Sequence, residues 1–549
     1  MFYRRLALVA SVIATCASAD PAALKAARPA LRAASPTAPS ATDRAGSLRY
    51  DHVAQKSVHN AYSRFEPLLD QLVYHRVRSL ELDIHTSKAG VAAEAGEWFV
   101  YHEDYPLFRD TSCARLGDCL GQLAAFHDAS PLHEVVTLFV DLKNDFTPGH
   151  DVADLDRRIE TSLGRENVVT PDDLVARCDG ATSLRDAVAG TCTFPTLAQL
   201  RGKFLVVTTG GSGCNAASHV RRYADAPGKR LGFAGPNVDA SCPVAALDTR
   251  RDIAFFNMAF SAIGQAPAIT ARGLVGRAYG SATSGGLDDA GAYATARAAG
   301  AVHLATDKVN AEQDAWATAH GAHGFPFTCD DCDDELKEEA SVLALRARGG
   351  DQNGEADSGV FAYEPTTGRS TWTSLVSVPS SHVEAGAKAC LIARESDAPG
   401  AANVALCRSF DVARPRLQVR PYAGAETFAV EAAPIPGLKD EAPAFLRLAV
   451  EPSPSGGTKI EALISGNGRT WSVVATTELE AALPLRGISV SANGDSVKGL
   501  FAGLTRSHGD GAHPVVAGEL VLAPIGTDAS GLAFDGFAEP VAPFGVAMR

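Results

Sequence analysis

The chain has 549 residues, of which 46% are hydrophobic and 21% are charged, and its formal net charge is −14 at pH 7. This balance is typical of a protein with more than one folded domain and excludes a largely disordered chain. The negative charge argues against nucleic acid as a partner and against electrostatic binding to an anionic membrane, because both require clustered Lys and Arg. A cation is the more natural partner.

The N-terminal segment is predicted to precede the folded domains. Residues 1–19 have the pattern of a secretory signal peptide: two Arg residues, the apolar run LALVASVIA, and small residues ending at Ala19. That run is too short to anchor the chain, so no transmembrane segment is expected in the mature protein. The prediction is a secreted or periplasmic protein, with lipidation at Cys16 as the alternative. Residues 20–47, rich in Ala, Pro and Ser, predict a disordered leader.

Residues 48–348 alternate short apolar runs with segments of helical period. The eight candidate strands are VAQKSVHN, VRSLELDIH, EWFVYHE, EVVTLFVDLK, KFLVVTTG, IAFFNMAF, GLVGRAYG and VHLATDKV. Strands that alternate with helices favour a parallel sheet. Eight of them over about 285 residues predict an α/β fold, the (β/α)8 barrel of TIM type.

The C-terminal part has a different pattern. Residues 349–359, GGDQNGEADSG, predict a solvated linker. Its alternating acids resemble a calcium loop, but the glycine is misplaced for an EF-hand. From 360 to 549, short alternating runs such as TKIEALISG and RGISVSANG are separated by Gly, Asn and Pro, which predicts an all-β sandwich of jelly-roll type.

Ten of the eleven Cys residues lie outside the predicted signal peptide, an even number that predicts disulfides in an exported chain. The pair Cys390 and Cys407 has the best support, because its two segments form a hairpin pattern around the turn DAPG. CDDC at 329–332 is also compatible with a redox or zinc half-motif. Pairing of neighbours predicts Cys113–Cys119, Cys178–Cys192, Cys214–Cys242, Cys329–Cys332 and Cys390–Cys407.

Polar side chains gather at the C-terminal ends of the predicted barrel strands, which in such barrels converge on one mouth. The first four strands contribute His59 and Asn60, Glu81 and Asp83, His102, and Asp141 with Lys143. Glu81 and Asp83 are two residues apart, so on a strand they share a face with Cβ atoms roughly 6 to 7 Å apart. Asn60 must be turned inward by the end of its strand.

These residue types predict a metal-assisted reaction. Asn60, Glu81, Asp83 and Asp141 form an all-oxygen set that suits one Ca²⁺ ion, or less well Mg²⁺. A metal bound to a hydroxyl or phosphoryl oxygen lowers the pKa of the first or offsets charge on the second. His59 and His102 supply groups that titrate near neutral pH and are the candidate catalytic residues. The combination indicates cleavage of a phosphodiester.

Two basic residues are candidates for binding the substrate phosphate. On strand four, Lys143 has the same parity as Asp141, so its side chain could reach a phosphate at the mouth. A surface lysine with a partly buried aliphatic stem is an equally good explanation of this position. Arg277 lies in strand seven, and Asp307, which ends strand eight, is a further candidate at the mouth.

HN followed by RSLELDIH, FVYHE and LFVDLK resembles the catalytic X region of phosphatidylinositol-specific phospholipase C, especially its calcium-dependent bacterial branch. The resemblance spans about residues 50 to 335 and is densest from 57 to 145. It implies that His59 contacts the phosphate, that His102 acts on the leaving group, and that Asn60, Glu81 and Asp83 bind calcium. Asp141 stands where the family often has Glu. In the metal-independent branch an Arg on strand two replaces the metal, whereas Arg78 here has outward parity.

The resemblance implies attack by an inositol 2-hydroxyl on phosphorus, with Asp141 or Glu81 as base, giving diacylglycerol and a cyclic inositol phosphate. The implied partner is a phospholipid at a membrane or micelle surface. Two alternatives stay open: a glycerophosphodiester phosphodiesterase, which typically has His-Arg in place of His-Asn, and a non-catalytic binding protein. Residues from about 360 resemble concanavalin-like modules, which implies a glycan ligand or a structural role.

Overall fold

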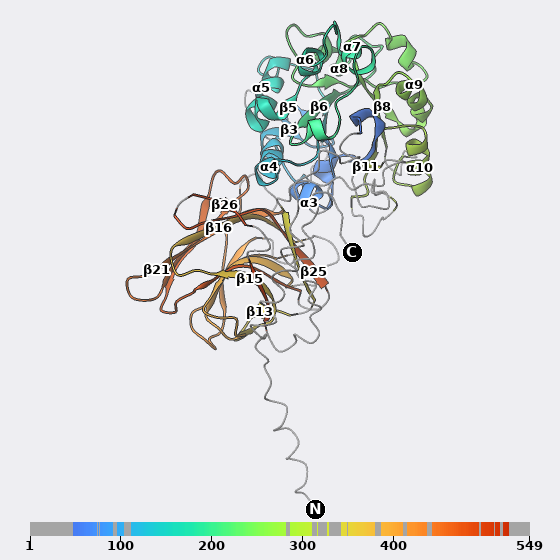
Figure 1. Cartoon of the computed structure of the whole chain (residues 1–549). Helices are drawn as coiled ribbons and strands as arrows, with labels where there is room; N and C mark the ends of the chain where they lie inside the picture. Colours follow the sequence, from blue (N-terminus) through green and yellow to red (C-terminus); the bar gives the residue numbers. More distant parts are fainter. Residues whose placement is uncertain are drawn as a thin grey trace, which may run out of the picture.

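The computed structural model describes residues 48–73, 75, 77–89, 91, 96–103, 111–280, 286–309, 316, 327–328, 342–348, 350–378, 386–409, 414–435, 442–492, 496–509, 511–515 and 520–525. The predicted signal peptide, the predicted leader and the pair Cys329–Cys332 lie outside these residues. Figure 1 shows an α/β domain, coloured blue to green, beside antiparallel sheets coloured yellow to red.

The α/β domain is built on a mainly parallel sheet with the strand path β5-β6-β4-β2-β1-β10-β9-β8. A further short strand, β7, pairs with β6 in parallel. All eight predicted strand segments supply strands of this sheet, seven of them parallel and one, β3, antiparallel. The bounds are β1 (Ala54–Val58), β2 (Ser79–His85), β4 (Val136–Leu142), β5 (Val168–Val169), β6 (Phe204–Thr209), β7 (Phe233–Ala234), β8 (Phe255–Ala259), β9 (Val275–Tyr279) and β10 (His303–Thr306).

The predicted closed barrel is found in part, because the described strands form an open path. β7 has two residues, too few to extend a ladder from β6 across to β8. Asn237 crosses this gap instead, with isolated parallel bridges to Ser212 on one side and to Asn257 of β8 on the other. The segment around Asn237 therefore connects the end of β6 to β8.

The third predicted strand is not a barrel strand. The segment EWFVYHE contains the two-residue β3 (Phe99–Val100), which pairs antiparallel with β2 through Ile84 and Val100. The chain turns back after β2 instead of crossing to the next parallel strand. This hairpin nevertheless brings His102 to the end of β2.

Burial of the parallel strands explains how they present polar groups. All seven residues of β2 are buried. Leu80, Leu82 and Ile84 join an apolar core that also contains residues of α4 and α5. Glu81 and Asp83 have the opposite parity and face the inside of the curved sheet. The helices are α3 (Leu68–Val73), α4 (Leu116–Ala129), α5 (Val152–Leu163), α6 (Pro171–Ala176), α7 (Leu184–Ala189), α8 (His219–Asp225), α9 (Ala266–Thr270) and α10 (Ala290–Ala298).

Two antiparallel sheets, each with seven strands among the described residues, share a second large apolar core. This agrees with the predicted sandwich. One sheet contains β12 (Val342–Arg348), β16 (Ser370–Ser377), β21 (Ala444–Pro452), β22 (Thr458–Ser465), β23 (Ser472–Leu479), β25 (Ser496–Ser507) and β26 (His513–Pro514). The other contains β15 (Gly359–Pro365), β17 (Lys388–Arg394), β18 (Asn403–Ser409), β19 (Arg416–Arg420), β20 (Phe428–Glu431), β24 (Leu485–Ser491) and β27 (Val521–Ile525).

The segment between the two parts of the chain differs from its prediction. β12, placed by the sequence before the linker, pairs along its whole length with β25 and so belongs to an antiparallel sheet. Within 350–359, β13 (Gln352–Asn353) and β14 (Ala356–Asp357) form a small hairpin. Asp357 is buried and forms ion pairs with Arg394 and Arg420. This segment is therefore folded against the sandwich and is not a solvated linker.

The sandwich packs on α3 and α4, the helices nearest to it in Figure 1. Leu375, Phe445 and Leu500 belong to the same apolar cluster as residues of these helices. The Ser377 hydroxyl donates to Asp70 of α3 at 2.5 Å, and Arg469 forms an ion pair with Asp128 of α4 at 2.9 Å. Apolar and polar contacts therefore both join the two parts.

Four predicted disulfides are confirmed: Cys113–Cys119, Cys178–Cys192, Cys214–Cys242 and Cys390–Cys407. The last joins directly opposed residues of the β17–β18 hairpin, as its sequence pattern predicts. Among the described residues, no helix is both long and apolar enough to cross a bilayer.

Candidate active site

The predicted site residues meet at the C-terminal ends of neighbouring parallel strands. Asn60 follows β1, Glu81 and Asp83 lie in β2, and Asp141 lies in β4 beside Asp83 in the register. Lys143 follows β4, and Arg277 lies in β9. Because adjacent parallel strands end together, side chains separated by up to about 250 residues in sequence come within contact distance.

Asn60 is turned into the site by an unusual backbone conformation. β1 ends at Val58, and Asn60 has φ 49° and ψ 54°, the one positive φ of a non-glycine residue in the described part of the chain. Asn tolerates this left-handed region better than most residues, and such strain concentrates at functional sites. Its backbone N–H donates to Glu81 Oε2 at 3.0 Å, and its side-chain Oδ1 accepts from Tyr62 at 3.3 Å.

Glu81 is a buried carboxylate held in its ionised form. Burial alone would raise its pKa, but the charges of Arg277 and His59 and the Asn60 N–H lower the pKa to about 2. Arg277, itself fully buried, lies 2.9 Å from Glu81 Oε2, and His59 Nε2 lies 3.7 Å from the same oxygen. Glu81 is therefore a strong charge partner and a poor proton acceptor near neutral pH.

Asp83 contacts both His102 and Lys143. His102 Nδ1 lies 2.9 Å from Asp83 Oδ2, and the same oxygen is 3.0 Å from Lys143 Nζ. Burial raises the pKa of Asp83, against the effect of these two partners. Its other oxygen, Oδ1, is buried and has no hydrogen-bond partner among the described atoms. One face of this carboxylate is thus available for a further cation or donor.

Lys143 bridges two of the four predicted metal ligands. Its ammonium lies 2.8 Å from Asp141 Oδ2 in addition to its contact with Asp83. Burial alone would lower the pKa of Lys143, but the two carboxylates raise it above its ordinary value, so the group stays protonated. Thr209, at the end of β6, donates to Asp141 Oδ1 at 2.6 Å. The half-buried Lys143 therefore contributes a positive charge within the cluster of carboxylates.

His59, which follows β1, is anchored by a carboxylate at the end of β10. Its Nδ1 lies 2.9 Å from Asp307 Oδ1, directly after β10, and Arg64 lies 2.9 Å from Asp307 Oδ2. Burial alone would lower the pKa of His59, but the charges of Glu81 and Asp307 outweigh burial and raise it. His59 also stacks near Tyr279, with ring centroids 6.1 Å apart. Asp307, a further candidate in the sequence, is thus brought into the site.

A chain of amides holds Arg277 in place. Arg277 Nη1 donates to Asn257 Oδ1 at 2.8 Å, and Asn257 Nδ2 donates to Asn237 Oδ1 at 2.8 Å. The Arg277 guanidinium also lies over the rings of Phe139 and Tyr279. A buried cation with a carboxylate, an amide and two aromatic faces has a fixed position, so it fixes the position of Glu81 as well.

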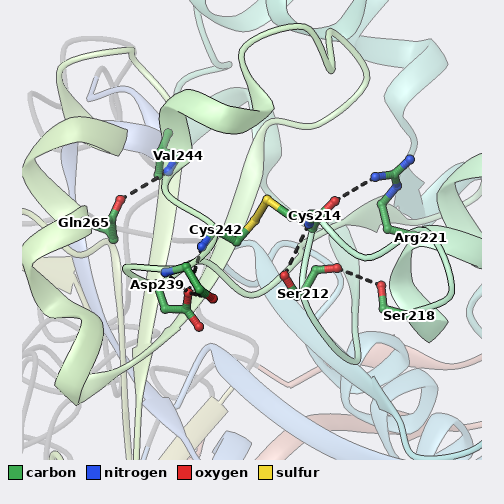
Figure 2. The surroundings of a disulfide bond; sticks show 10 residues. Ser212, Cys214, Ser218, Arg221, Asp239, Cys242, Val244 and Gln265 are labelled. Carbon is green, nitrogen blue, oxygen red and sulfur yellow. Dashed lines mark hydrogen bonds between the residues drawn. A yellow bond between two sulfur atoms is a disulfide. The ribbon is translucent and has the colours of Figure 1, made fainter.

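A disulfide joins two loops at the same end of the sheet. Figure 2 shows the disulfide Cys214–Cys242, which connects the loop after β6 to the loop after β7. Gly210 begins the first loop at φ 125°, where a Cβ would lie 2.8 Å from the Leu142 carbonyl oxygen, so glycine is required there. The second loop carries Asn237. The disulfide therefore lies close to Asn237, which accepts a hydrogen bond from Asn257, and Asn257 in turn accepts one from Arg277.

Sequence reasoning missed several members of this site. Tyr62 and Arg64 lie only a few residues beyond Asn60, but nothing in their spacing distinguishes them from other loop residues. Thr209 and Asn257 lie at or near strand ends within predicted strands. Asn257 pairs with Arg277 between β8 and β9, so the two side chains lie on the same face of the sheet. This strand alternation was the one sequence signal that could have placed Asn257 in the site.

The donor set fits calcium in chemistry. Asn60, Glu81, Asp83 and Asp141 offer amide and carboxylate oxygens, the ligands that calcium prefers, and Asp83 Oδ1 is a buried oxygen without a partner. Among the described residues, however, no group of three or more His, Cys, Asp or Glu side chains is arranged for a metal ion. Lys143 lies between Asp83 and Asp141. Calcium binding at these oxygens would thus compete with the Lys143 ammonium.

The chain matches no protein-family model and no curated protein. Among solved structures, it is similar to a calcium-dependent phosphoinositol-specific phospholipase C from Pseudomonas sp, with 23% identity, 48% of this chain and 90% of that chain covered, and a TM-score of 0.42. It is also similar to a Ca²⁺-dependent phosphatidylinositol-specific phospholipase C from Streptomyces antibioticus, with 22% identity, coverages of 48% and 96%, and a TM-score of 0.39.

Proposed function

We propose that this chain is a phosphodiesterase of the phospholipase C kind, which cleaves phosphatidylinositol-type lipids to diacylglycerol and a cyclic inositol phosphate. One observation carries the proposal: two imidazoles at one mouth, His59 and His102, are each anchored through Nδ1 by a carboxylate, Asp307 and Asp83. An imidazole anchored through Nδ1 presents Nε2 on the other side of its ring, and Nε2 is the atom we propose for acid–base chemistry on the phosphodiester.

The cations of the site complement a phosphodiester. Lys143 and Arg277 lie among the acids, and Arg64 lies beside Asp307. They offset the charge of the carboxylates, which would otherwise repel an anionic substrate. His59, whose pKa is raised by Glu81 and Asp307 against the effect of burial, donates to a phosphoryl oxygen in its protonated form.

The proposed reaction takes one proton from the nucleophile and supplies another to the leaving group. The inositol 2-hydroxyl gives its proton to Asp141, because the pKa of Glu81, lowered to about 2, makes Glu81 a poor proton acceptor. The hydroxyl oxygen then bonds to phosphorus, and the bond from phosphorus to the diacylglycerol oxygen breaks. His102 gives a proton to that oxygen, so diacylglycerol leaves as a neutral alcohol.

We propose one calcium ion as cofactor, held by oxygens of Asn60, Glu81, Asp83 and Asp141. When bound, calcium would offset phosphoryl charge and lower the pKa of the attacking hydroxyl. The support from this chain is the oxygen donor set and the buried Asp83 Oδ1 without a partner.

The proposed location is outside the cytoplasm, either secreted or periplasmic. Four disulfides among the described residues fit an oxidising compartment, and the signal-peptide pattern at residues 1–19 supports export. The substrate would then be met at a membrane or micelle surface.

Release of diacylglycerol from mixed micelles tests the function. The purified protein is incubated with phosphatidylinositol or with phosphatidylcholine, in calcium or in excess chelator, beside His59→Ala and His102→Ala. Diacylglycerol from phosphatidylinositol alone, lost in both variants, is the expected result. Cleavage of glycerophosphoinositol in place of the lipid would favour a glycerophosphodiester phosphodiesterase. No cleavage of either compound would favour a binding protein.

A further inference from the structure

A cavity of about 540 Å³ lies at the end of the α/β domain opposite to the candidate active site. Three of its lining residues precede strands of the parallel sheet: Arg49 precedes β1, Arg251 precedes β8, and Arg272 precedes β9. The candidate active site, in contrast, is built from residues at or after strand ends. Because adjacent parallel strands begin together and end together, the cavity is separated from the mouth by the length of the strands.

Arginine supplies most of the charge in this cavity. Its charged lining residues are Arg49, Arg185, Arg251, Arg272 and Asp248. Asp51 pairs with Arg49. Asp186 pairs with Arg251, so three carboxylates are set against four guanidinium groups. Within this set one positive charge is uncompensated, although the whole chain has a net charge of −14. Such a local excess of positive charge attracts an anion.

Arg185 is the buried member of this set, with 5% of its surface exposed. Its Nε donates to the Ile253 carbonyl oxygen at 2.8 Å, and its Nη2 has no hydrogen-bond partner among the described atoms. Its Nη1 reaches Asp248 Oδ1 only at 3.5 Å, whereas Arg272 binds the same carboxylate through hydrogen bonds of 2.9 and 3.0 Å. Burial lowers the pKa of Arg185, and Asp248 does not outweigh burial together with the neighbouring guanidinium groups. The charge of Arg185 is therefore only partly compensated within the protein.

The more exposed arginines keep unpaired donors at the cavity. Arg251, whose side chain is 52% exposed, contacts Asp186 through Nη2, so its Nε and Nη1 have no partner among the described residues. Arg49 contacts Asp51 through Nε and Nη2, which leaves its Nη1 without a partner in the same part of the chain. An anion can bind these N–H groups without displacing either ion pair. The cavity therefore has free donors in addition to its excess of positive charge.

The positions of these donors favour a tetrahedral oxyanion. Arg49 and Arg251 approach from segments before different strands, so an anion with oxygens in several directions satisfies both better than a planar carboxylate does. Guanidinium groups match phosphate oxygens well, and a phosphate monoester carries a charge of about −1.5 to −2 at pH 7. The cavity also has the size of pockets that hold small molecules, about 300–1,000 Å³, and so exceeds what a free phosphate ion fills. We propose that this cavity binds a small soluble molecule that carries a phosphate monoester.

The ligand is a soluble molecule because of where the cavity lies. A lipid surface that presents substrate to the mouth meets the opposite end of the sheet, so its headgroups do not reach these arginines. This choice of source rests on the proposed function, whereas phosphate binding itself does not, since the cavity shares no residue with the mouth. A ligand held between the segments before β1, β8 and β9 binds the folded chain alone and therefore raises its thermal stability.

Isothermal titration calorimetry and melting temperatures of the full protein test the proposal. Three probes share one sugar ring: glucose 6-phosphate, glucuronate and glucose. Vesicles of phosphatidylcholine with phosphatidic acid present the same phosphate monoester on a lipid. Arg251→Gln removes donors from the cavity, and Arg157→Gln is the matched control, because Arg157 is also exposed and also pairs with an aspartate. His59→Ala changes the mouth and leaves the cavity intact.

Glucose 6-phosphate should bind saturably and raise the melting temperature. Its Kd should rise on the order of tenfold in Arg251→Gln and stay unchanged in Arg157→Gln and His59→Ala. Arg272→Gln is a second variant that should weaken binding in the same direction.

Four results would overturn the proposal: no binding of glucose 6-phosphate, equally tight binding of glucuronate or glucose, binding to the vesicles alone, or binding that Arg251→Gln keeps and His59→Ala abolishes. Arg251→Gln should also keep the diacylglycerol-releasing activity, so a failure of the proposed function is seen in a separate assay.

Discussion

His59 Nδ1 lies 2.9 Å from Asp307 Oδ1, although 248 positions separate the two residues in the sequence. The parallel pairing of β1 with β10 creates this contact, since His59 follows one strand and Asp307 the other. Asp307 orients the ring and, with Glu81, raises the pKa of His59 against the effect of burial.

Asp307→Asn should keep a side chain of the same shape and remove the charge. We expect kcat on phosphatidylinositol micelles to fall on the order of a hundredfold, the lower end of acid–base contributions, with little change in KM. Steady-state kinetics measure this. Asp145→Asn is the control, because Asp145 pairs with His219 on the surface. An unchanged kcat in Asp307→Asn would remove Asp307 from the mechanism.

Lys143→Met should strengthen calcium binding. The Lys143 ammonium lies 3.0 Å from Asp83 and 2.8 Å from Asp141, so it competes with a cation for the same oxygens. Its removal should lower the calcium Kd on the order of tenfold, a free-energy change of ~1.4 kcal/mol. Isothermal titration calorimetry measures the Kd, with Lys229→Met, a surface lysine paired with Asp172, as control. Weaker calcium binding in Lys143→Met would mean that Lys143 supports the ion instead of competing with it.

Asn257→Ala should destabilise the fold and disturb the site together. The change leaves Arg277 Nη1 buried without its 2.8 Å acceptor, at a cost of about 1–3 kcal/mol. The free energy of unfolding from urea titration measures this loss, and kinetics should show a fall in kcat because Arg277 positions Glu81. Asn215→Ala, at an exposed loop position, is the control. Full stability in Asn257→Ala would show that Arg277 is held by Glu81 and the aromatic rings alone.

Stability should fall on acidification because buried histidines are neutral in the folded state. Burial lowers the pKa of His75 to about 3 and that of His133 and His303 well below 6.5. The unfolded chain binds these protons near pH 6.5 and the folded chain does not, so the contribution is complete above that pH and is lost as pH falls. Each group should cost about 1.4 kcal/mol at pH 5.5.

Urea titrations from pH 7 to 5 measure this effect. His75→Leu should reduce the pH slope by about one proton, whereas His52→Gln, at a residue whose side chain is 57% exposed, should leave the slope unchanged. A free energy of unfolding that does not change between pH 7 and 5.5 would mean that these histidines are protonated, or accessible, in the native state.

Replacing both cysteines of the Cys214–Cys242 disulfide by serine should destabilise the protein more than the same change at Cys113–Cys119. The first pair closes a loop of 28 residues and the second a loop of 6. Loop entropy in the unfolded chain then predicts losses of about 3–4 and about 2 kcal/mol. Urea denaturation of the two double variants measures the difference. Equal losses would point to native-state contacts as the larger contribution.

Much of the α/β domain was predictable because its strands are buried apolar runs with clear ends. Glu81 and Asp83 interrupt such a run at alternate positions, so their shared face followed from strand parity alone. His59, Asn60, Asp141 and Lys143 follow from the same rule, since they lie at or beyond strand ends. Four disulfide pairs followed from the order of the cysteines.

Other features depend on contacts that local patterns do not contain. β5 and β7 have two residues each, too few to show the alternation of apolar and polar residues that predicts a strand. The sequence of β3 is compatible with a barrel strand, because a short apolar run does not reveal whether its partner is parallel or antiparallel. The linker-like composition of 349–359 does not reveal that Asp357 is buried, since its burial depends on Arg394 and Arg420, which lie 37 and 63 positions away. The role of Lys143 also depends on a tertiary contact, its ion pair with Asp83 of the neighbouring strand.

Phosphorus NMR of the protein with phosphatidylinositol micelles tests the central claim most directly, because it observes the phosphorus atom at which the bond is cleaved. In calcium, the account predicts that the lipid phosphodiester resonance is replaced by that of a cyclic inositol phosphate. The conversion should stop in excess chelator and in His59→Ala or His102→Ala. A lipid resonance that persists in calcium, or a conversion that continues without either histidine, would contradict the assignment of this site.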